Sequence, residues 1–158
     1  MSAEVEYLTN KASATEIDEH LWKCDIDFMP SLSSRVKISN YAQKIFSKAT
    51  RFEAWSGGML IGLVAIYCNN QENHIAYITS VSVINEWGGK GIAVYLVSQC
   101  IKHMDALGMK QICLEVASGN MPAIKLYEKC GFVASNPNAL FVTMSLFLKS
   151  GEGYEQQA

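Results

Sequence analysis

Three glycines surround a lysine in the segment Asn85–Ala93, which reads NEWGGKGIA. The preceding residues, HIAYITSVSVI, are rich in β-branched and aromatic side chains and predict a strand over 74–84. The following residues repeat apolar side chains at helical spacing and predict a helix over 92–107, with Gly108 at its C-terminal cap. A glycine loop between a strand and a helix presents free backbone N–H groups at the positive end of the helix dipole. The segment therefore predicts an anion-binding cradle.

The common nucleotide-binding motifs do not fit this loop. Lys90 is followed by Gly91 and not by Ser or Thr, and the spacing GxxxxGK is absent. The dinucleotide pattern GxGxxG is also incomplete. Neither a Walker A loop nor a dinucleotide-binding fold is therefore predicted.

The remaining segments alternate between helical and strand patterns. Helices are expected over 14–27, 40–49 and Asn120–Cys130, with N-caps at Ser13 or Thr15, at Ser39 or Asn40, and at Asn120. Further strands are expected over 51–55, 59–68, 110–116 and 139–148, the first two joined by a glycine turn. This order predicts an α/β fold with a mixed, mostly antiparallel central sheet and helices on both faces.

Length and charge limit the protein to a few classes. The chain of 158 residues is the size of one domain, expected over 1–150 with a polar tail over 151–158. A net charge of -2 provides no basic surplus for nucleic acid, and no apolar run is long enough to span a membrane. We expect a cytoplasmic protein without nucleic-acid or membrane partners.

The cysteines argue against a disulfide framework and against a metal site. There are five of them, an odd number, and no two form a CxxC pair. Reduced thiols, mostly buried as small apolar side chains, are the simplest interpretation.

Two segments resemble the GCN5-related N-acetyltransferase (GNAT) superfamily. ITSVSVINEWGGKGIAVYL is similar to its acetyl-CoA signature, although Gly88 stands where the family usually has Arg or Gln. NMPAIKLYEKCGF is similar to its second signature, and the likeness covers roughly residues 75–148. The resemblance implies a single-domain GNAT-like fold and acetyl-CoA as cosubstrate, without a metal. It also implies the cofactor-binding residues, which are Val81, Ser82, Val83, Gly88, Gly89, Lys90, Gly91, Ile92, Ala93 and Asn120.

The resemblance also suggests two catalytic residues. Glu115 matches the base and Tyr127 the acid of bacterial acetyltransferases that act on ribosomal-protein N-termini. Glu115 could equally be a surface carboxylate, because other family members place their base where Tyr77 or Thr79 lies. Tyr127 could instead be a core tyrosine whose hydroxyl is satisfied.

The acceptor is less well defined. An N-acetyltransferase acting on a primary amine of a small molecule, such as an amino sugar or polyamine, is the favoured function. A protein or peptide N-terminus or lysine is the alternative acceptor, and a non-catalytic CoA-binding sensor is the alternative of another class. The segment WKCDIDFMPSLSSRV is expected to shape the acceptor side, and a homodimer is left open.

Overall fold

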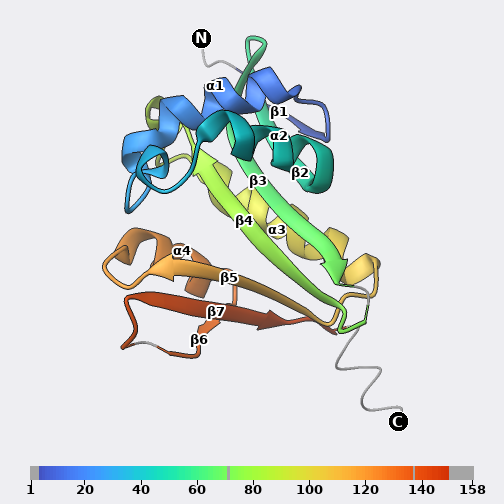
Figure 1. The fold of residues 1–158 in the computed structure, drawn as a ribbon. Coiled ribbons are helices and arrows are strands. Elements are labelled where there is room, and N and C mark those ends of the chain that lie inside the picture. Colours follow the sequence, from blue (N-terminus) through green and yellow to red (C-terminus); the bar gives the residue numbers. More distant parts are fainter. Residues whose placement is uncertain (1–3, 71, 137, 150–158) are drawn as a thin grey trace.

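One sheet organises the computed structural model, which describes residues 4–70, 72–136 and 138–149. Its strand order is β1-β2-β3-β4-β5-β7-β6, and every neighbouring pair is antiparallel except β4 and β5 (Figure 1). The predicted mixed, mostly antiparallel sheet is confirmed. The strands are β1 (Glu6–Thr9), β2 (Thr50–Ser56), β3 (Met59–Asn70), β4 (Ile75–Val83), β5 (Gln111–Ala117), β6 (Val133–Ala134) and β7 (Phe141–Phe147).

Helices cover both faces of this sheet, as predicted. Alternate residues of β3 show the division, because Leu63 and Ala65 pack in the α1 and α2 layer while Val64 and Ile66 pack in the α3 and α4 layer. The α-helices are α1 (Ala14–Cys24), α2 (Ile38–Lys48), α3 (Ile92–Ala106) and α4 (Met121–Lys129), and the 3-10 helices are η1 (Asp25–Asp27), η2 (Leu32–Ser34) and η3 (Asn85–Trp87).

Local sequence signals placed most of the helix ends. Ser13 caps α1 in a reciprocal capping box with Glu16, and the Asn120 side chain accepts a hydrogen bond at the start of α4. Gly108 has a positive φ directly after the cap of α3. The predicted second helix is present, but its predicted N-cap was wrong, because α2 begins at Ile38, before Ser39 and Asn40, and has Lys37 as a cap without a side-chain bond.

One further helix end and two short strands differ from the prediction. The first helix ends at Cys24, and residues 25–27 continue it only as the tighter η1 turn. The short edge strands β1 and β6 were not predicted at all. Both are too short for a clear alternation of apolar and polar side chains, so their strand conformation depends on pairing with a distant neighbour. The predicted tail over 151–158 lies outside the described residues.

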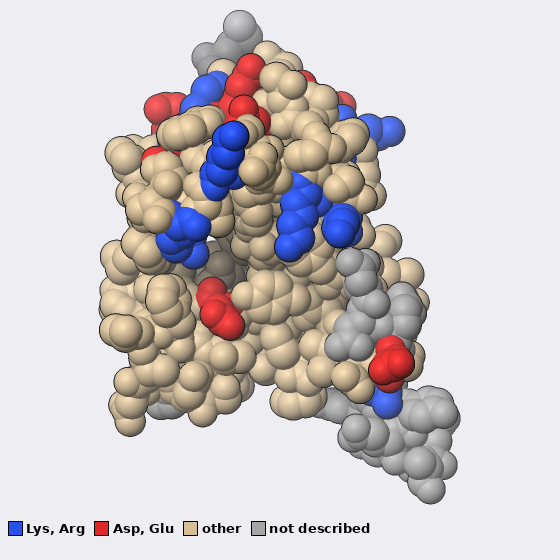
Figure 2. All heavy atoms as spheres, viewed as in Figure 1, with Lys and Arg blue, Asp and Glu red and all other residues tan. Residues whose placement is uncertain are grey.

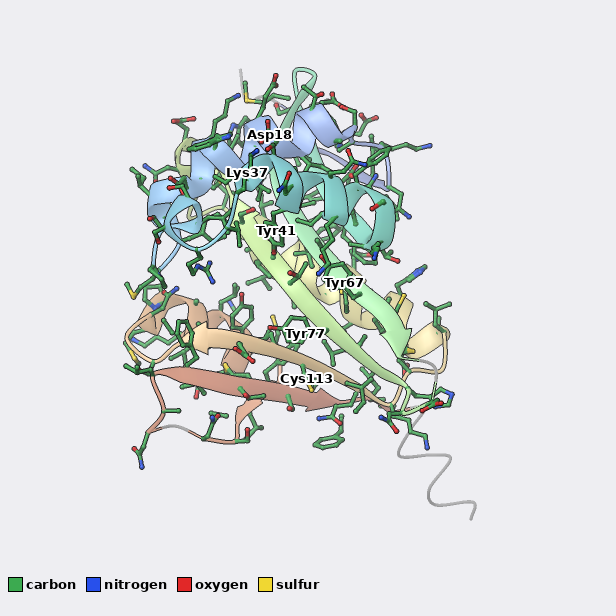
Figure 3. All side chains as sticks on the ribbon, in the orientation of Figure 1. Asp18, Lys37, Tyr41, Tyr67, Tyr77 and Cys113 are labelled. Carbon is green, nitrogen blue, oxygen red and sulfur yellow. The ribbon has the colours of Figure 1, made fainter. Side chains whose placement is uncertain are left out.

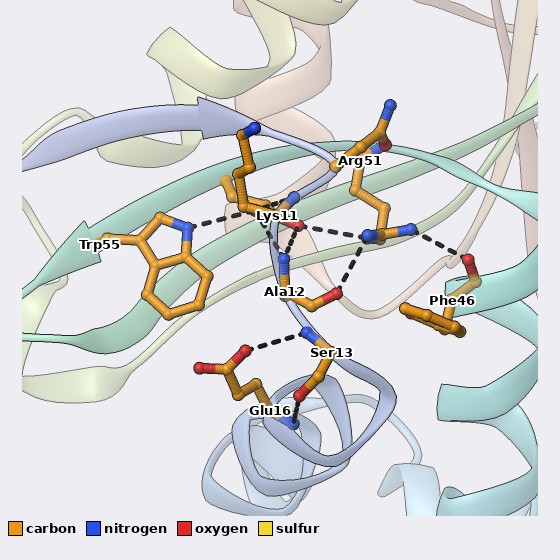
Figure 4. A network of polar contacts seen from close by, with 9 residues as sticks. Lys11, Ala12, Ser13, Glu16, Phe46, Arg51 and Trp55 are labelled. Carbon is orange, nitrogen blue, oxygen red and sulfur yellow. Dashed lines mark hydrogen bonds and ion pairs between the residues drawn. The ribbon is translucent and has the colours of Figure 1, made fainter.

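A buried carboxylate fixes the connection between β1 and α1 (Figure 4). Glu53 on β2 is fully buried and accepts hydrogen bonds from the backbone N–H groups of Lys11 and Ala12. It also forms an ion pair with Arg51 and accepts a bond from the indole N–H of Trp55. Every donor around this carboxylate is supplied by the protein itself.

Candidate functional site

A large pocket opens where β4 and β5 separate. The two strands pair only from Ile75 to Tyr77 on β4, and beyond that point they diverge (Figure 1). The space between them is about 790 Å³ and is lined by both strands, by α4 and by the segment between α1 and α2. The hollow is visible on the face shown in Figure 2. Its size is typical of a ligand site.

A β-bulge in β4 shapes the acceptor wall of this pocket. The pairing of β3 with β4 runs from Ser80 directly to Ile78, so Thr79 is the extra residue. The Tyr41 hydroxyl donates to the Thr79 carbonyl at 2.7 Å and lies 2.6 Å from the Thr79 hydroxyl. This contact joins α2 to the bulge, and Figure 3 shows Tyr41 between them. Burial raises the pKa of Tyr41 to about 12, so its phenol stays protonated.

The adjacent Ser80 is unusual among the pocket residues. It is 5% exposed, lines the pocket, and its hydroxyl has no hydrogen-bond partner in the described chain. A buried polar group without a partner costs free energy, which a bound ligand can recover.

Ser82 has a hidden partner on the first helix. Its hydroxyl lies 2.8 Å from Nε2 of His20, and Nδ1 of His20 lies 2.9 Å from the Leu60 carbonyl. Because a carbonyl can only accept, Nδ1 carries the proton and the Ser82 hydroxyl must donate to Nε2. Burial lowers the pKa of His20 to about 4, which keeps the imidazole neutral. His20 is buried, and both of its ring nitrogens are occupied by partners in the chain, so we assign it a structural role.

The glycine loop has the open geometry that the sequence suggested. Gly89 and Gly91 have φ values of +74° and +79°, and a Cβ at either position would meet no atom within 4 Å. Gly91 is the N-cap of α3 and offers no side chain, so the first N–H groups of this helix have no side-chain cap. Gly89 and Ala93 line the pocket, which leaves room for an anion at the helix N-terminus.

The other loop residues contribute differently. Gly88, Lys90 and Gly91 are exposed, and none of them is part of the pocket lining. The Ile92 side chain is buried in the core, where it packs closely against Gly62. Ile92 can therefore offer a ligand only its backbone N–H.

Glu115 projects from β5 into the pocket. It is exposed and alternates with the buried Leu114 and Val116, which confirms the predicted strand face. Within the described chain its carboxylate has no hydrogen-bond or ion-pair partner. Burial raises the pKa of the neighbouring Tyr77, with Glu115 adding to the effect and Arg35 opposing it. The Tyr77 hydroxyl is thus within electrostatic reach of both charges.

Tyr127 lies on the opposite wall, on α4. It is 8% exposed, lines the pocket and packs edge-to-face on Phe132 with ring centroids 6.0 Å apart. Burial raises the pKa of its phenol, and nearby Cys130 adds to this. No hydrogen bond of its hydroxyl to another described residue is present, so a satisfied core tyrosine is not what the geometry shows. A proton on this phenol is held at neutral pH and remains available to a ligand.

The remaining predicted residues also meet here. Val81, Ser82 and Val83 line the pocket along β4, and Asn120 lines it at the start of α4. The Asn120 oxygen accepts from the Ala123 N–H at 3.4 Å, which leaves its amide N–H groups free to donate.

Sequence reasoning missed several lining residues. Tyr41 and Ser80 carry no motif, and Arg35 was expected only as a member of the acceptor segment WKCDIDFMPSLSSRV. Their place in the pocket follows from the bulge and from the packing of α2. Within the described ranges, no three His, Cys, Asp or Glu side chains are grouped to hold a metal ion. No helix there is long and apolar enough to cross a membrane.

Residues 14–132 match the sequence profile of the acetyltransferase (GNAT) family. Mycothiol acetyltransferase from Corynebacterium glutamicum is 29% identical over 87 residues, which cover 55% of this chain and 29% of that protein. The N-alpha-acetyltransferase MAK3 from Arabidopsis thaliana is 32% identical over 83 residues, which cover 52% of this chain and 44% of that protein. The chain thus matches less than half the length of these curated relatives.

Solved structures share the fold at lower identity. A protein from Pyrococcus horikoshii OT3 superposes with a TM-score of 0.76 at 21% identity, covering 92% of this chain and 99% of that chain. The protein yncA from Salmonella typhimurium, with its cofactor acetyl-CoA, superposes with a TM-score of 0.70 at 16% identity, covering 90% of this chain and 94% of that chain.

Proposed function

Because this chain belongs to the GNAT family of acetyltransferases, we propose that it transfers the acetyl group of acetyl-CoA to a primary amine of a small molecule. One observation carries the proposal. A single pocket joins an open glycine cradle to two protonatable side chains on its walls, Glu115 and Tyr127, which have no hydrogen-bond partner among the described residues.

The pocket fits an extended anionic thioester. The uncapped N–H groups at the start of α3 and the space above Gly89 and Gly91 suit a pyrophosphate. Backbone groups of residues 81–83 and the Asn120 amide suit the amide groups of the pantetheine arm. Gly88 has no side chain to replace the usual Arg or Gln, so we assign anion binding to the backbone.

The proposed mechanism has two proton transfers, one at Glu115 on β5 and one at Tyr127 on α4. Acetyl-CoA supplies the thioester carbonyl that an amine attacks and the thiolate that departs. An alkylammonium has a pKa of about 10, so a base must remove its proton first. The Glu115 carboxylate takes this proton, directly or through water, and the Tyr127 hydroxyl donates its own to the departing sulfur. Burial suits Tyr127 to this role, because it keeps the phenol protonated until a thiolate forms.

A small acceptor is favoured by the wall between α1 and α2. The Asp25 carboxylate accepts hydrogen bonds from the backbone N–H and the hydroxyl of Ser33, both at 2.7 Å. These bonds lower the pKa of Asp25 and hold the loop over the pocket, where Phe28 and Met29 line it. A fixed wall narrows the entrance for a peptide. Because N-alpha-acetyltransferases are among the relatives, a peptide N-terminus is the second candidate for the acceptor.

A panel of amines tests the proposal. Amino sugars, polyamines and short peptides would each be incubated with acetyl-CoA, and the products analysed by mass spectrometry. Mass spectrometry is preferable to a thiol reagent, because the cysteines of the chain are free. Acetylation of a small amine that disappears in Tyr127→Phe would support the proposal. Acetylation of peptides alone would favour the second candidate, and acetyl-CoA binding without any transfer would indicate a sensor.

The free thiols and the need for acetyl-CoA favour the cytoplasm as the site of action.

A further inference from the structure

The segment that forms η2 and α2, beside the pocket, is basic. The segment 31–48, which forms η2 and α2, contains Arg35, Lys37, Lys44 and Lys48 and no Asp or Glu. Figure 2 shows several positive side chains on the part of this face above the hollow and a negative side chain at the hollow itself. A field of this sign attracts anionic ligands and repels polycations.

Arg35 is the basic side chain that reaches the pocket itself. It lines the pocket together with the acidic residues Asp27 and Glu115, but within the described chain it pairs with neither at 4.0 Å or less. Its backbone is fixed, because its N–H donates to the Leu32 carbonyl at 3.0 Å and the adjacent Ser33 is held by Asp25. A guanidinium without a carboxylate partner has its whole fork of donors available to a bound anion.

Arg35 and Glu115 both lie close enough to Tyr77 to affect its pKa. The charge of Arg35 and the charge of Glu115 act in opposite directions on the same Tyr77 hydroxyl. Figure 3 shows Tyr77 where β4 and β5 separate, below α2. Both side chains line the same pocket as this ring, so a ligand bound over the ring can contact a carboxylate and a guanidinium. The partnerless Ser80 hydroxyl, nearly buried in the same pocket, adds a third polar contact for it.

We propose that the acceptor is a small primary amine that also carries an anionic group, a carboxylate or a phosphate, and that Arg35 binds this group while the amine lies at Glu115. The inference rests on the proposed acetyl transfer and narrows its substrate class. It argues against polyamines, since their second ammonium would lie beside the Arg35 guanidinium. A guanidinium binds a carboxylate and a phosphate with the same paired donors, so the structure favours neither.

The test uses three matched amines: glucosamine, glucosamine 6-phosphate and glucosaminic acid, with spermidine as the polycation. Acetylation of each is followed by mass spectrometry, and binding of each to the protein is measured by calorimetry without acetyl-CoA. We expect at least one anionic amine to exceed glucosamine about tenfold or more in kcat/KM, and spermidine to be the poorest. The phosphate and carboxylate arms then show which anion is preferred.

Variants assign the effect to Arg35. Arg35→Gln should raise KM and Kd for the anionic amine about 10- to 100-fold, as expected for a lost charged hydrogen bond, and should raise those for glucosamine much less. Lys48→Gln is the control, because it removes an equal charge from α2 but lies outside the pocket lining. It should change neither KM nor Kd for the anionic amine. Equal kcat/KM for charged and neutral amines, or an Arg35→Gln variant with unchanged KM, would overturn the inference while acetyl transfer itself stands. Acetyl-CoA binding with no transfer to any amine would overturn the proposed function and the inference with it.

Discussion

Glu53 and Glu115 project from strands of the same sheet into opposite surroundings. Glu53 is fully buried and accepts hydrogen bonds from two backbone N–H groups, from Arg51 and from Trp55 (Figure 4). Glu115 is exposed in the pocket, and within the described chain its carboxylate has no such donor. The first carboxylate is paired within its own chain, and the second is open to solvent and to a ligand.

The same contrast holds for whole regions. In the β1, β2 and α1 region, Arg51 and Glu53 are paired with each other and with neighbouring backbone groups, so these interactions contribute to folding. One exception in the described chain is Oδ1 of Asp18 on α1, which is buried without a hydrogen-bond partner. The pocket walls keep the Ser80 hydroxyl without a partner and the Tyr127 hydroxyl without a hydrogen bond in the described chain. Unpaired polar groups weaken the folded state, so we propose that those in the pocket serve binding. Changes in the first region should therefore affect stability, and changes in the second should affect catalysis or affinity.

The largest expected effect is on stability, from Glu53→Ala. The change leaves the Arg51 guanidinium buried and unpaired and removes the acceptor of several N–H groups. Loss of one member of a buried ion pair costs about 3–5 kcal/mol, so urea unfolding should show a reduction of that size in the free energy of unfolding. Glu115→Ala is the matched control and should change it by no more than about 0.5 kcal/mol. Similar losses from both variants would contradict the comparison.

His20 lies between the two regions, since it is fully paired yet touches the pocket residue Ser82. Its pKa is about 4 in the folded protein against 6.5 ordinarily, so the unfolded chain takes up a proton first as the pH falls. Stability from this group is complete above pH 6.5 and is lost between pH 6.5 and 4, up to about 3 kcal/mol. His20→Gln should flatten the curve of unfolding free energy over this range. Parallel curves for the two proteins would show that His20 does not titrate in this way.

Tyr127→Phe removes one hydroxyl from the pocket wall and keeps the ring packed on Phe132. If the hydroxyl is the general acid, kcat should fall about 100-fold or more while the melting temperature stays nearly constant. Steady-state kinetics and thermal unfolding of the same preparation measure both quantities. A lower melting temperature with unchanged kcat would identify a core tyrosine.

Glu115→Gln should lower turnover about 100-fold near neutral pH and recover part of it as the pH rises, because more acceptor amine is then already deprotonated. The acid limb of kcat/KM for the acceptor measures this. Tyr77→Phe is the control, since Tyr77 lies beside Glu115 on the neighbouring strand. An acid limb that moves in Tyr77→Phe but not in Glu115→Gln would transfer the role of base to β4.

The smallest expected effect concerns the glycine cradle. Gly89→Val should weaken acetyl-CoA binding about tenfold, because its side chain enters the open space next to the N-terminus of α3. Gly58→Val is closely matched, with a φ of +77° against +74° and no atom near its Cβ, but it lies in the β2–β3 turn. Both variants should lose about 1–2 kcal/mol of stability from backbone strain. Only Gly89→Val should bind acetyl-CoA more weakly in calorimetry. Equal acetyl-CoA affinities of the two variants would exclude this loop as the anion site.

Much of the fold follows from local patterns. Apolar spacing predicted the four α-helices and most strands, since a helix or strand face repeats within a few residues. The caps at Ser13 and Asn120 were readable because their bonds span three residues. The glycines at 57 and 58 likewise form the predicted two-residue turn, with positive φ at both positions. The open glycine loop was predicted for the same local reason.

The tertiary structure alone decided which distant residues complete the site. His20 and Ser82 lie 62 positions apart, and their contact depends on how α1 packs on β4. The bulge at Thr79 depends on the register between β3 and β4, and no single-strand pattern marks it. Strand β1 and the position of Arg35 also depend on pairing and packing across the chain. Sequence by itself determined the elements and the two motifs, because propensities and periodicity act over a few residues. Strand register and packing between segments decided which residues line the acceptor side of the pocket, because both depend on the whole core at once.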